Sequence, residues 1–292
     1  TVDEEGLSPK IAVGFEEARG EIVSMLEDDD QWLPDKLRLV RDLMRQERAD
    51  FLHNSKIRTY DDRVLPPDEQ VDLRNCGFSA RAGPGFRGAG LRSFPRLWSC
   101  VYNNSAISLR RDFVLQDEGL VRFLKAYNDT PGVDWLLTLY AFERGVALHV
   151  PEPLTLLNTH NYFDGLSLPP EASIAGAIRT RRSHLKVFEF LSSRCRTRTC
   201  RLVIDMLRMG DYPYFLLADG AGHVNLKPMR ALARFVGENL LPYILLPLFS
   251  PRTFFARTLW LLAPSAMIRL VLSEPARLVA RYSRKGLLTK YS

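Results

Sequence analysis

Apolar residues recur at helical spacing in two segments near the start of the sequence, residues 9–19 and the stretch that follows Pro34. Between them, residues 21–27 form a short apolar run with β-branched side chains, which predicts a buried strand. The order helix, strand, helix predicts an α/β fold with a largely parallel sheet. The apolar face expected for the second helix comprises Leu37, Val40, Leu43 and Met44.

Farther along, apolar runs and helical patterns alternate up to about residue 150. They predict strands at residues 50–60, 101–109 and 146–150, and helices at residues 117–127 and 134–144. Gly145 is expected to end the last of these helices. Residues 61–95 are rich in Pro, Gly and Arg, which predicts a long loop.

The composition is that of a globular protein, since 46% of the 292 residues are apolar and 25% are charged. It excludes a disordered chain, collagen and a coiled-coil rod. The charge is divided unevenly, with a net charge of −8 on residues 1–178 and +14 on residues 179–292. This asymmetry predicts an acidic domain at residues 1–171 and a basic, largely helical C-terminal region at residues 172–292.

The basic region contains apolar blocks broken by prolines, which predicts short helices. Short apolar helices with arginines on one face are typical of proteins that lie on an anionic membrane surface. A helical subdomain that packs on the core is the alternative. No nucleic-acid partner is expected, because the aromatic residues fall within the apolar blocks and show no interleaved stacking pattern.

The four cysteines show no metal-binding pattern. Cys195 and Cys200 are close in sequence, but no second pair or nearby His completes a metal site. Together with Cys76 and Cys100, they are expected to be reduced thiols in a cytoplasmic protein.

Four consecutive carboxylates, residues 27–30, follow the first predicted strand. Ligands bind at the carboxyl ends of strands in open α/β sheets. Adjacent carboxylates repel one another, so a cation or full solvation must offset the repulsion. An oxygen-only set suits Mg²⁺ or Mn²⁺, which usually also bind substrate phosphates. The alternative is a solvated acidic turn before the helix at Pro34.

Two stretches around these carboxylates, residues 16–22 (EEARGEI) and 26–37 (LEDDDQWLPDKL), closely resemble glycosyltransferase family 2. Members of this family are nucleotide-sugar transferases of the GT-A fold. Further similar stretches are residues 105–111, 132–137 and 150–154, with His160 after them. The resemblance covers about residues 6–167 and implies a Rossmann-like, mixed, mostly parallel sheet. Only 26 residues precede Glu27, so the family's first βαβ unit is expected to be missing.

The resemblance implies roles for several residues on the donor side of the site. Asp29 aligns with the aspartate that holds the donor diphosphate through a divalent cation. Asp28 aligns with the position near the donor ribose or the metal, and Glu27 takes the first place of the metal motif. His160 is expected to contact the metal or a phosphate. Many family members contact the donor with a positively charged side chain at a position close to Lys10. Lys10 is a candidate for supplying that positive charge here.

On the acceptor side, Asp134 aligns with the base that removes a proton from the acceptor hydroxyl. Trp135, Arg110 and Arg111 are expected to lie near the acceptor. The implied function is an inverting, metal-dependent transfer of a sugar to a glycan or lipid-linked acceptor, at the inner face of the membrane. Val133 stands where the family often has Glu. The alternative is therefore an inactive relative that serves as a basic membrane- or nucleic-acid-binding module.

Overall fold

The computed structural model describes residues 6–60, 63–67, 70, 76–88, 101–127, 132–158, 184–205, 207, 240 and 244. The chain forms two compact units, one of Thr1–Thr159 with Lys186–Ile204 and the other of His160–Leu185 with Asp205–Ser292. Almost all described residues belong to the first unit. The expected domain boundary at residue 171 lies outside the described residues. No helix in the described part is long and apolar enough to span a membrane.

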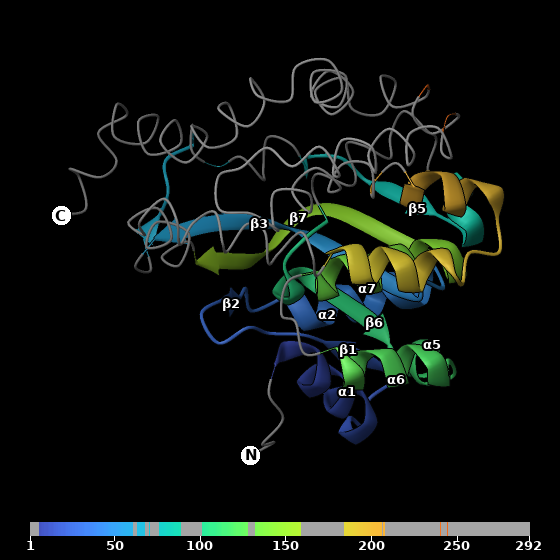
Figure 1. Ribbon diagram of the computed structural model, residues 1–292. Coiled ribbons are helices and arrows are strands. Elements are labelled where there is room, and N and C mark those ends of the chain that lie inside the picture. Colours follow the sequence, from blue (N-terminus) through green and yellow to red (C-terminus); the bar gives the residue numbers. More distant parts are fainter. Residues whose placement is uncertain are drawn as a thin grey trace, which may run out of the picture. The chain divides into compact units, whose positions relative to one another are not determined.

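The first unit combines helices and a mixed sheet (Figure 1). The helices are α1 (Leu7–Glu17), α2 (Lys36–Gln46), α5 (Arg111–Leu115), α6 (Glu118–Ala126) and α7 (Val133–Arg144), with 3₁₀ turns η1 (Pro84–Phe86) and η2 (Asn104–Ala106). The strands are β1 (Ile22–Ser24), β2 (Gln31–Trp32), β3 (Phe51–Tyr60), β4 (Arg63–Val64), β5 (Ala80–Ala82), β6 (Ile107–Arg110) and β7 (Ala147–Asn158). Residues 184–192 and 198–205 are also helical.

The strand order is β1-β6-β3-β7-β2, with β4 beside β3 and β5 beside β7. The mixed α/β fold is therefore confirmed, and the long strands β3 and β7 lie side by side (Figure 1). The expectation of mostly parallel pairs is wrong for the described strands, because only β3 and β7 pair in parallel. Strands β1 and β3 do run in the same direction, but β6 is inserted between them and runs antiparallel to both.

The predicted helices α1, α2, α6 and α7 and the strand β3 are confirmed within a few residues. Other elements differ from their predicted bounds. β1 is a short, half-buried edge strand rather than a buried one. β6 is shorter than predicted because η2 occupies its start, and β7 continues to Asn158. The predicted loop at residues 61–95 contains β4, β5 and η1 in its described part, and α5 was not predicted.

Helix α2 packs on β3 and β7 through a cluster of buried apolar side chains. The cluster comprises Val40, Met44, Ala49, Leu52, Leu148, Val150 and Leu154. The predicted face of α2 is wrong at Leu37, which is 55% exposed. Lys36 is fully buried instead and lies on the same face as Val40 and Met44, at spacings of four residues.

Gly145 ends α7 as predicted, and it lies against two side chains that leave no room for a larger residue. A Cβ atom there would lie 2.7 Å from Cε2 of Phe113 and 2.9 Å from Cβ of Asp50. We therefore expect Gly145→Ala to lower the free energy of unfolding by about 1–3 kcal/mol through overpacking. Urea unfolding at neutral pH measures the difference.

Gly14 provides the matched control, because it lies within α1 and a Cβ atom there has no neighbour within 4 Å. Gly14→Ala should raise the free energy of unfolding by about 0.5–1 kcal/mol, since alanine loses less backbone entropy in a helix. Equal stability of the two variants would contradict the close packing around Gly145.

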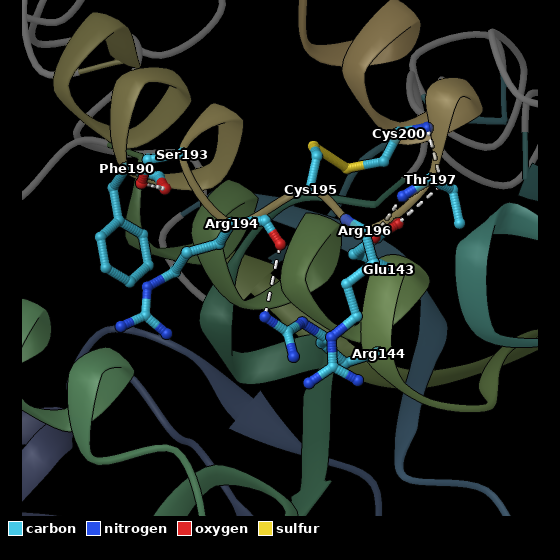
Figure 2. Close-up of a disulfide and its surroundings, with 9 residues drawn as sticks. All are labelled: Glu143, Arg144, Phe190, Ser193, Arg194, Cys195, Arg196, Thr197 and Cys200. Atoms are coloured by element: carbon cyan, nitrogen blue, oxygen red, sulfur yellow. Dashed lines mark hydrogen bonds between the residues drawn. A yellow bond between two sulfur atoms is a disulfide. The ribbon is translucent and has the colours of Figure 1, made fainter.

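Cys195 and Cys200 form a disulfide, which corrects the expectation of reduced thiols (Figure 2). The turn between two helical segments brings their Cα atoms to 5.7 Å, within the range that a disulfide spans. Sequence spacing alone does not reveal this turn. The same turn is held by Glu143 of α7, whose carboxylate accepts hydrogen bonds from the backbone N–H of Arg196 and Thr197. Cys76 is a buried free thiol, and Cys100 lies outside the described residues.

Loss of this disulfide should destabilise the first unit moderately. The closed loop is short, with a sequence separation of 5. Chain-entropy reasoning for such a loop gives a loss of roughly 2 kcal/mol in the free energy of unfolding for Cys195→Ser with Cys200→Ser. Urea unfolding with and without dithiothreitol measures it. The reductant should destabilise the unmodified protein and leave the double variant unchanged; an effect of the reductant on the variant would point to another cause.

Candidate functional site

The acidic turn, residues 27–30, lies beyond the C-terminal end of β1 and beside the start of η2. The backbone N–H of Glu27 donates to Oγ of Ser105 at 2.8 Å, and the N–H of Asp30 donates to the Glu27 carbonyl at 3.3 Å. The turn is thereby fixed to the segment that precedes β6. Asp28 is exposed, Asp29 is half-buried and Asp30 is buried.

Asn103 connects this turn to helix α7. Its side-chain amide donates to Oε2 of Glu27 at 2.6 Å and to Oδ2 of Asp30 at 2.9 Å. Its backbone N–H donates to Oδ2 of Asp134 at 3.0 Å. The neighbouring Asn104 amide donates to the other Glu27 oxygen at 3.0 Å. Carboxylates from two distant parts of the sequence therefore meet around one asparagine.

Burial and negative charge act together on Glu27. Burial raises the pKa of Glu27, and the nearby carboxylates of Asp30, Asp134 and Asp29 raise it further, against the hydrogen bond from Asn104. Asp30 is also held by the backbone N–H of Asn158 at the end of β7, at 2.9 Å. The cluster therefore concentrates negative charge where three elements meet, which is an arrangement suited to a cation or to hydroxyl groups.

Asp134 occupies the first turn of α7, a helix that follows Gly132, whose φ of 99° lies in the region that glycine adopts without strain. Its Oδ1 accepts the backbone N–H of Trp135 at 2.8 Å. Trp135 stacks on Phe188 with ring centroids 6.1 Å apart. The structure thus brings Asp134 and Trp135 together at one helix end, and the assignment of Trp135 to the acceptor side stays a prediction.

Two fully buried lysines lie beneath the cluster and were not predicted from the sequence. Nζ of Lys36 donates to the Ser105 carbonyl and to Oγ1 of Thr155, the latter at 3.0 Å. Burial lowers the pKa of Lys36 to about 7, although Asp30 opposes the shift. Nζ of Lys56 donates to the Tyr102 carbonyl at 2.8 Å and lies 3.4 Å from the centroid of the Tyr102 ring. Both lysines therefore hold the chain segment that carries Asn103.

Arg110 and Arg111 lie at the end of β6, beside the start of β1 and away from the acidic turn, and their place near the acceptor stays a prediction. Arg110 pairs with Ile22 at the start of β1, and it forms ion pairs with Asp112 and Asp50. Arg111 donates to the carbonyls of Phe15 and Glu16. The reason is strand direction: β6 runs antiparallel to β1 and β3, so its end lies beside their beginnings.

Two donor-side candidates remain, Lys10 and His160. Lys10 lies exposed on α1, so its donor role stays a prediction. His160 lies outside the described residues, and its metal or phosphate role also stays a prediction.

The carboxylate oxygens of the acidic turn are ligands of the type that a divalent cation binds. Within the described residues, no group of three or more His, Cys, Asp and Glu side chains is arranged to hold a metal ion. Mg²⁺ is usually bound by one or two carboxylates together with substrate phosphates. Both oxygens of Glu27 already accept amide hydrogen bonds. Asp29, with the exposed Asp28 beside it, is therefore the better candidate ligand.

Comparison with known proteins finds similarity in structure alone. No protein-family model matches the chain, and no curated protein matches it in sequence. A solved structure of S. aureus TarS, residues 1–349, is 11% identical and has a TM-score of 0.51, covering 96% of this chain and 72% of that one. A structure of TarS in complex with UDP-GlcNAc is 12% identical with a TM-score of 0.52, covering 98% and 74%. The chain therefore shares the fold of TarS.

Proposed function

We propose that the protein is a glycosyltransferase that moves a sugar from a nucleotide-diphosphate donor to an acceptor hydroxyl. The observation that carries the proposal is the convergence of the acidic turn and Asp134 around Asn103. The resemblance of residues 16–37 to glycosyltransferase family 2 supports it. The shared fold with a protein that was solved with a nucleotide sugar bound supports it further.

In the proposed reaction, Asp134 accepts the proton of the acceptor hydroxyl, which then attacks the anomeric carbon opposite the diphosphate. A base with this task must lie within hydrogen-bond reach of the hydroxyl. Hydrogen bonds from Asn103 and Trp135 orient the Asp134 carboxylate. Attack from the side opposite the leaving diphosphate inverts the configuration of the anomeric carbon.

The proposed cofactor is Mg²⁺ or Mn²⁺, held by Asp29 with Asp28 beside it. When bound, such a cation stabilises the negative charge that develops on a leaving diphosphate. The proposed acceptor is a glycan or a lipid-linked molecule of the cell envelope. The positive charge of residues 179–292 supports contact with an anionic membrane surface.

A donor screen tests the proposal. UDP-, GDP- and dTDP-sugars are offered to the protein with Mn²⁺ or with EDTA, and binding and sugar release are measured. We expect one donor class to bind, and Asp29→Ala to lose the metal-dependent part of that binding. Asp35→Ala is the control, because Asp35 is exposed at the start of α2 and pairs with Arg38. Absence of binding by every donor would overturn the proposal and favour an inactive, membrane-binding module.

A further inference from the structure

Asn103 is the one residue in the described chain that reaches the acidic turn with its side chain and Asp134 with its backbone. Glu27, Asp30 and Asp134 would repel one another at these distances. A neutral amide links them by hydrogen bonds without cancelling their charge, whereas a lysine at this position would offset part of that charge. The choice of asparagine thus preserves the negative potential of the site.

The backbone of Asn103 is strained. Its φ of 72° and ψ of 120° lie in a region that non-glycine residues rarely occupy. Such a conformation persists only where surrounding contacts determine it, and it is found preferentially at functional sites. Here the strained φ aims the N–H at Asp134 while the amide faces the acidic turn.

The segment around Asn103 is held firmly from beneath. The Ser105 carbonyl accepts hydrogen bonds from Lys36 and from Oγ1 of Thr155, the latter at 3.2 Å. Lys56 holds the Tyr102 carbonyl on the other side of Asn103. These contacts fix the backbone before and after Asn103, so they maintain its strained conformation.

From this geometry we infer that Asn103 is a positioning residue, which fixes Asp134 relative to the acidic turn and so sets the alignment of acceptor and donor. The inference rests on the proposed function, because it concerns the same site. Asn103 acts through Asp134 on one side and through Glu27 and Asp30 on the other.

Asn103→Gly separates positioning from folding. Glycine relieves the strained φ and keeps the N–H that faces Asp134, but it removes both amide contacts. We expect kcat for sugar transfer to fall about 10–100-fold, as is typical for residues that orient a site. The melting temperature should change little, because relief of the strained φ offsets the loss of the two amide contacts. Asn103→Asp, which turns the amide contacts into repulsions, should lose at least as much activity and provides a second test if the glycine variant folds poorly.

Arg48→Gly is the matched control. Arg48 is exposed after α2 and also has a positive φ, of 51°. Its replacement should likewise relieve strain and should leave kcat unchanged.

A double variant tests the link to the base. If Asn103 acts through Asp134, adding Asn103→Gly to Asp134→Asn should cost no more than roughly twofold in kcat, because residues that act as a unit are not additive. Full multiplication of the two losses, or wild-type kcat in Asn103→Gly, would overturn the inference while leaving the proposed function intact. Absence of transfer by the unmodified protein would overturn the proposed function and the inference with it.

Discussion

Asp134→Asn should lower the rate of sugar transfer about 10²–10⁴-fold, which is the range that a positioned general base contributes. Asn lacks the negative oxygen that would accept the acceptor proton. In the present structure each Asp134 oxygen accepts a backbone N–H, from Asn103 and from Trp135. The asparagine must therefore turn its NH₂ group toward one of these donors. Donor binding should persist, because the acidic turn is unchanged. Single-turnover transfer at saturating donor, together with a donor-binding titration, measures both quantities.

Asp112→Asn is the matched control for this prediction. Asp112 also lies in the first turn of a helix, α5, and its Oδ1 accepts the N–H of the following residue at 2.9 Å. It lies beside Arg110, at the end of β6 and away from the acidic turn. Its transfer rate should equal that of the unmodified protein. An undiminished rate in Asp134→Asn would assign the base to another residue.

The sequence predicted elements whose side chains follow a local period, and it located the acidic turn at the end of β1. Helix α2 shows the limit of prediction from apolar spacing. Apolar spacing assigned Leu37 to the buried face, whereas the buried position is Lys36, which a hydrophobic pattern does not count. Lys36 is accommodated because its ammonium finds the Ser105 carbonyl and Thr155, which lie 69 and 119 residues away in sequence.

The rest of the site depends on pairings between distant segments. The position of Arg110 and Arg111 away from the acidic turn follows from the insertion of β6 between β1 and β3, which no local pattern encodes. Asn103 lies in no sequence motif that indicates its role. That role comes from a backbone conformation and from partners 31 to 76 residues away. A polar pair before a short strand, as in Asn103-Asn104, is the only clue that the sequence offered.

The first unit should lose unfolding free energy between pH 7 and pH 5 through two buried histidines, His53 and His149, with about 2 kcal/mol of the loss coming from His149. They are partners in the parallel β3–β7 register, with their Nδ1 atoms 2.9 Å apart. Burial lowers the pKa of His53 well below its usual value, and it lowers the pKa of His149 to about 4. Lys56 lowers the pKa of both through its charge.

The hydrogen bonds explain why neither ring accepts a further proton. The Cys76 carbonyl accepts from His149 at 3.0 Å, so the hydrogen of His149 is on Nε2 and its Nδ1 is an acceptor. His53 therefore donates from Nδ1, and its Nε2 faces the Lys56 ammonium at 3.5 Å. A proton on His149 Nδ1 would replace its hydrogen bond with His53 by a repulsion between two N–H groups. A proton on His53 Nε2 would face the Tyr102 carbonyl at 3.4 Å, but it would also oppose the Lys56 ammonium.

The sign follows from proton binding. Below pH 6.5 the unfolded chain protonates both histidines, while the folded chain keeps them neutral down to about pH 4 for His149. The unfolded state then binds more protons, so stability falls as the pH falls through this window. Glu27, whose pKa is raised in the folded chain, acts in the opposite direction at the acidic end.

Urea unfolding at pH 7 and pH 5, at constant ionic strength, measures the loss. His149→Gln retains an amide that can donate to Cys76 but does not titrate, so it should remove the loss of about 2 kcal/mol that His149 causes. An unchanged pH dependence in that variant would show that other groups cause the acid destabilisation.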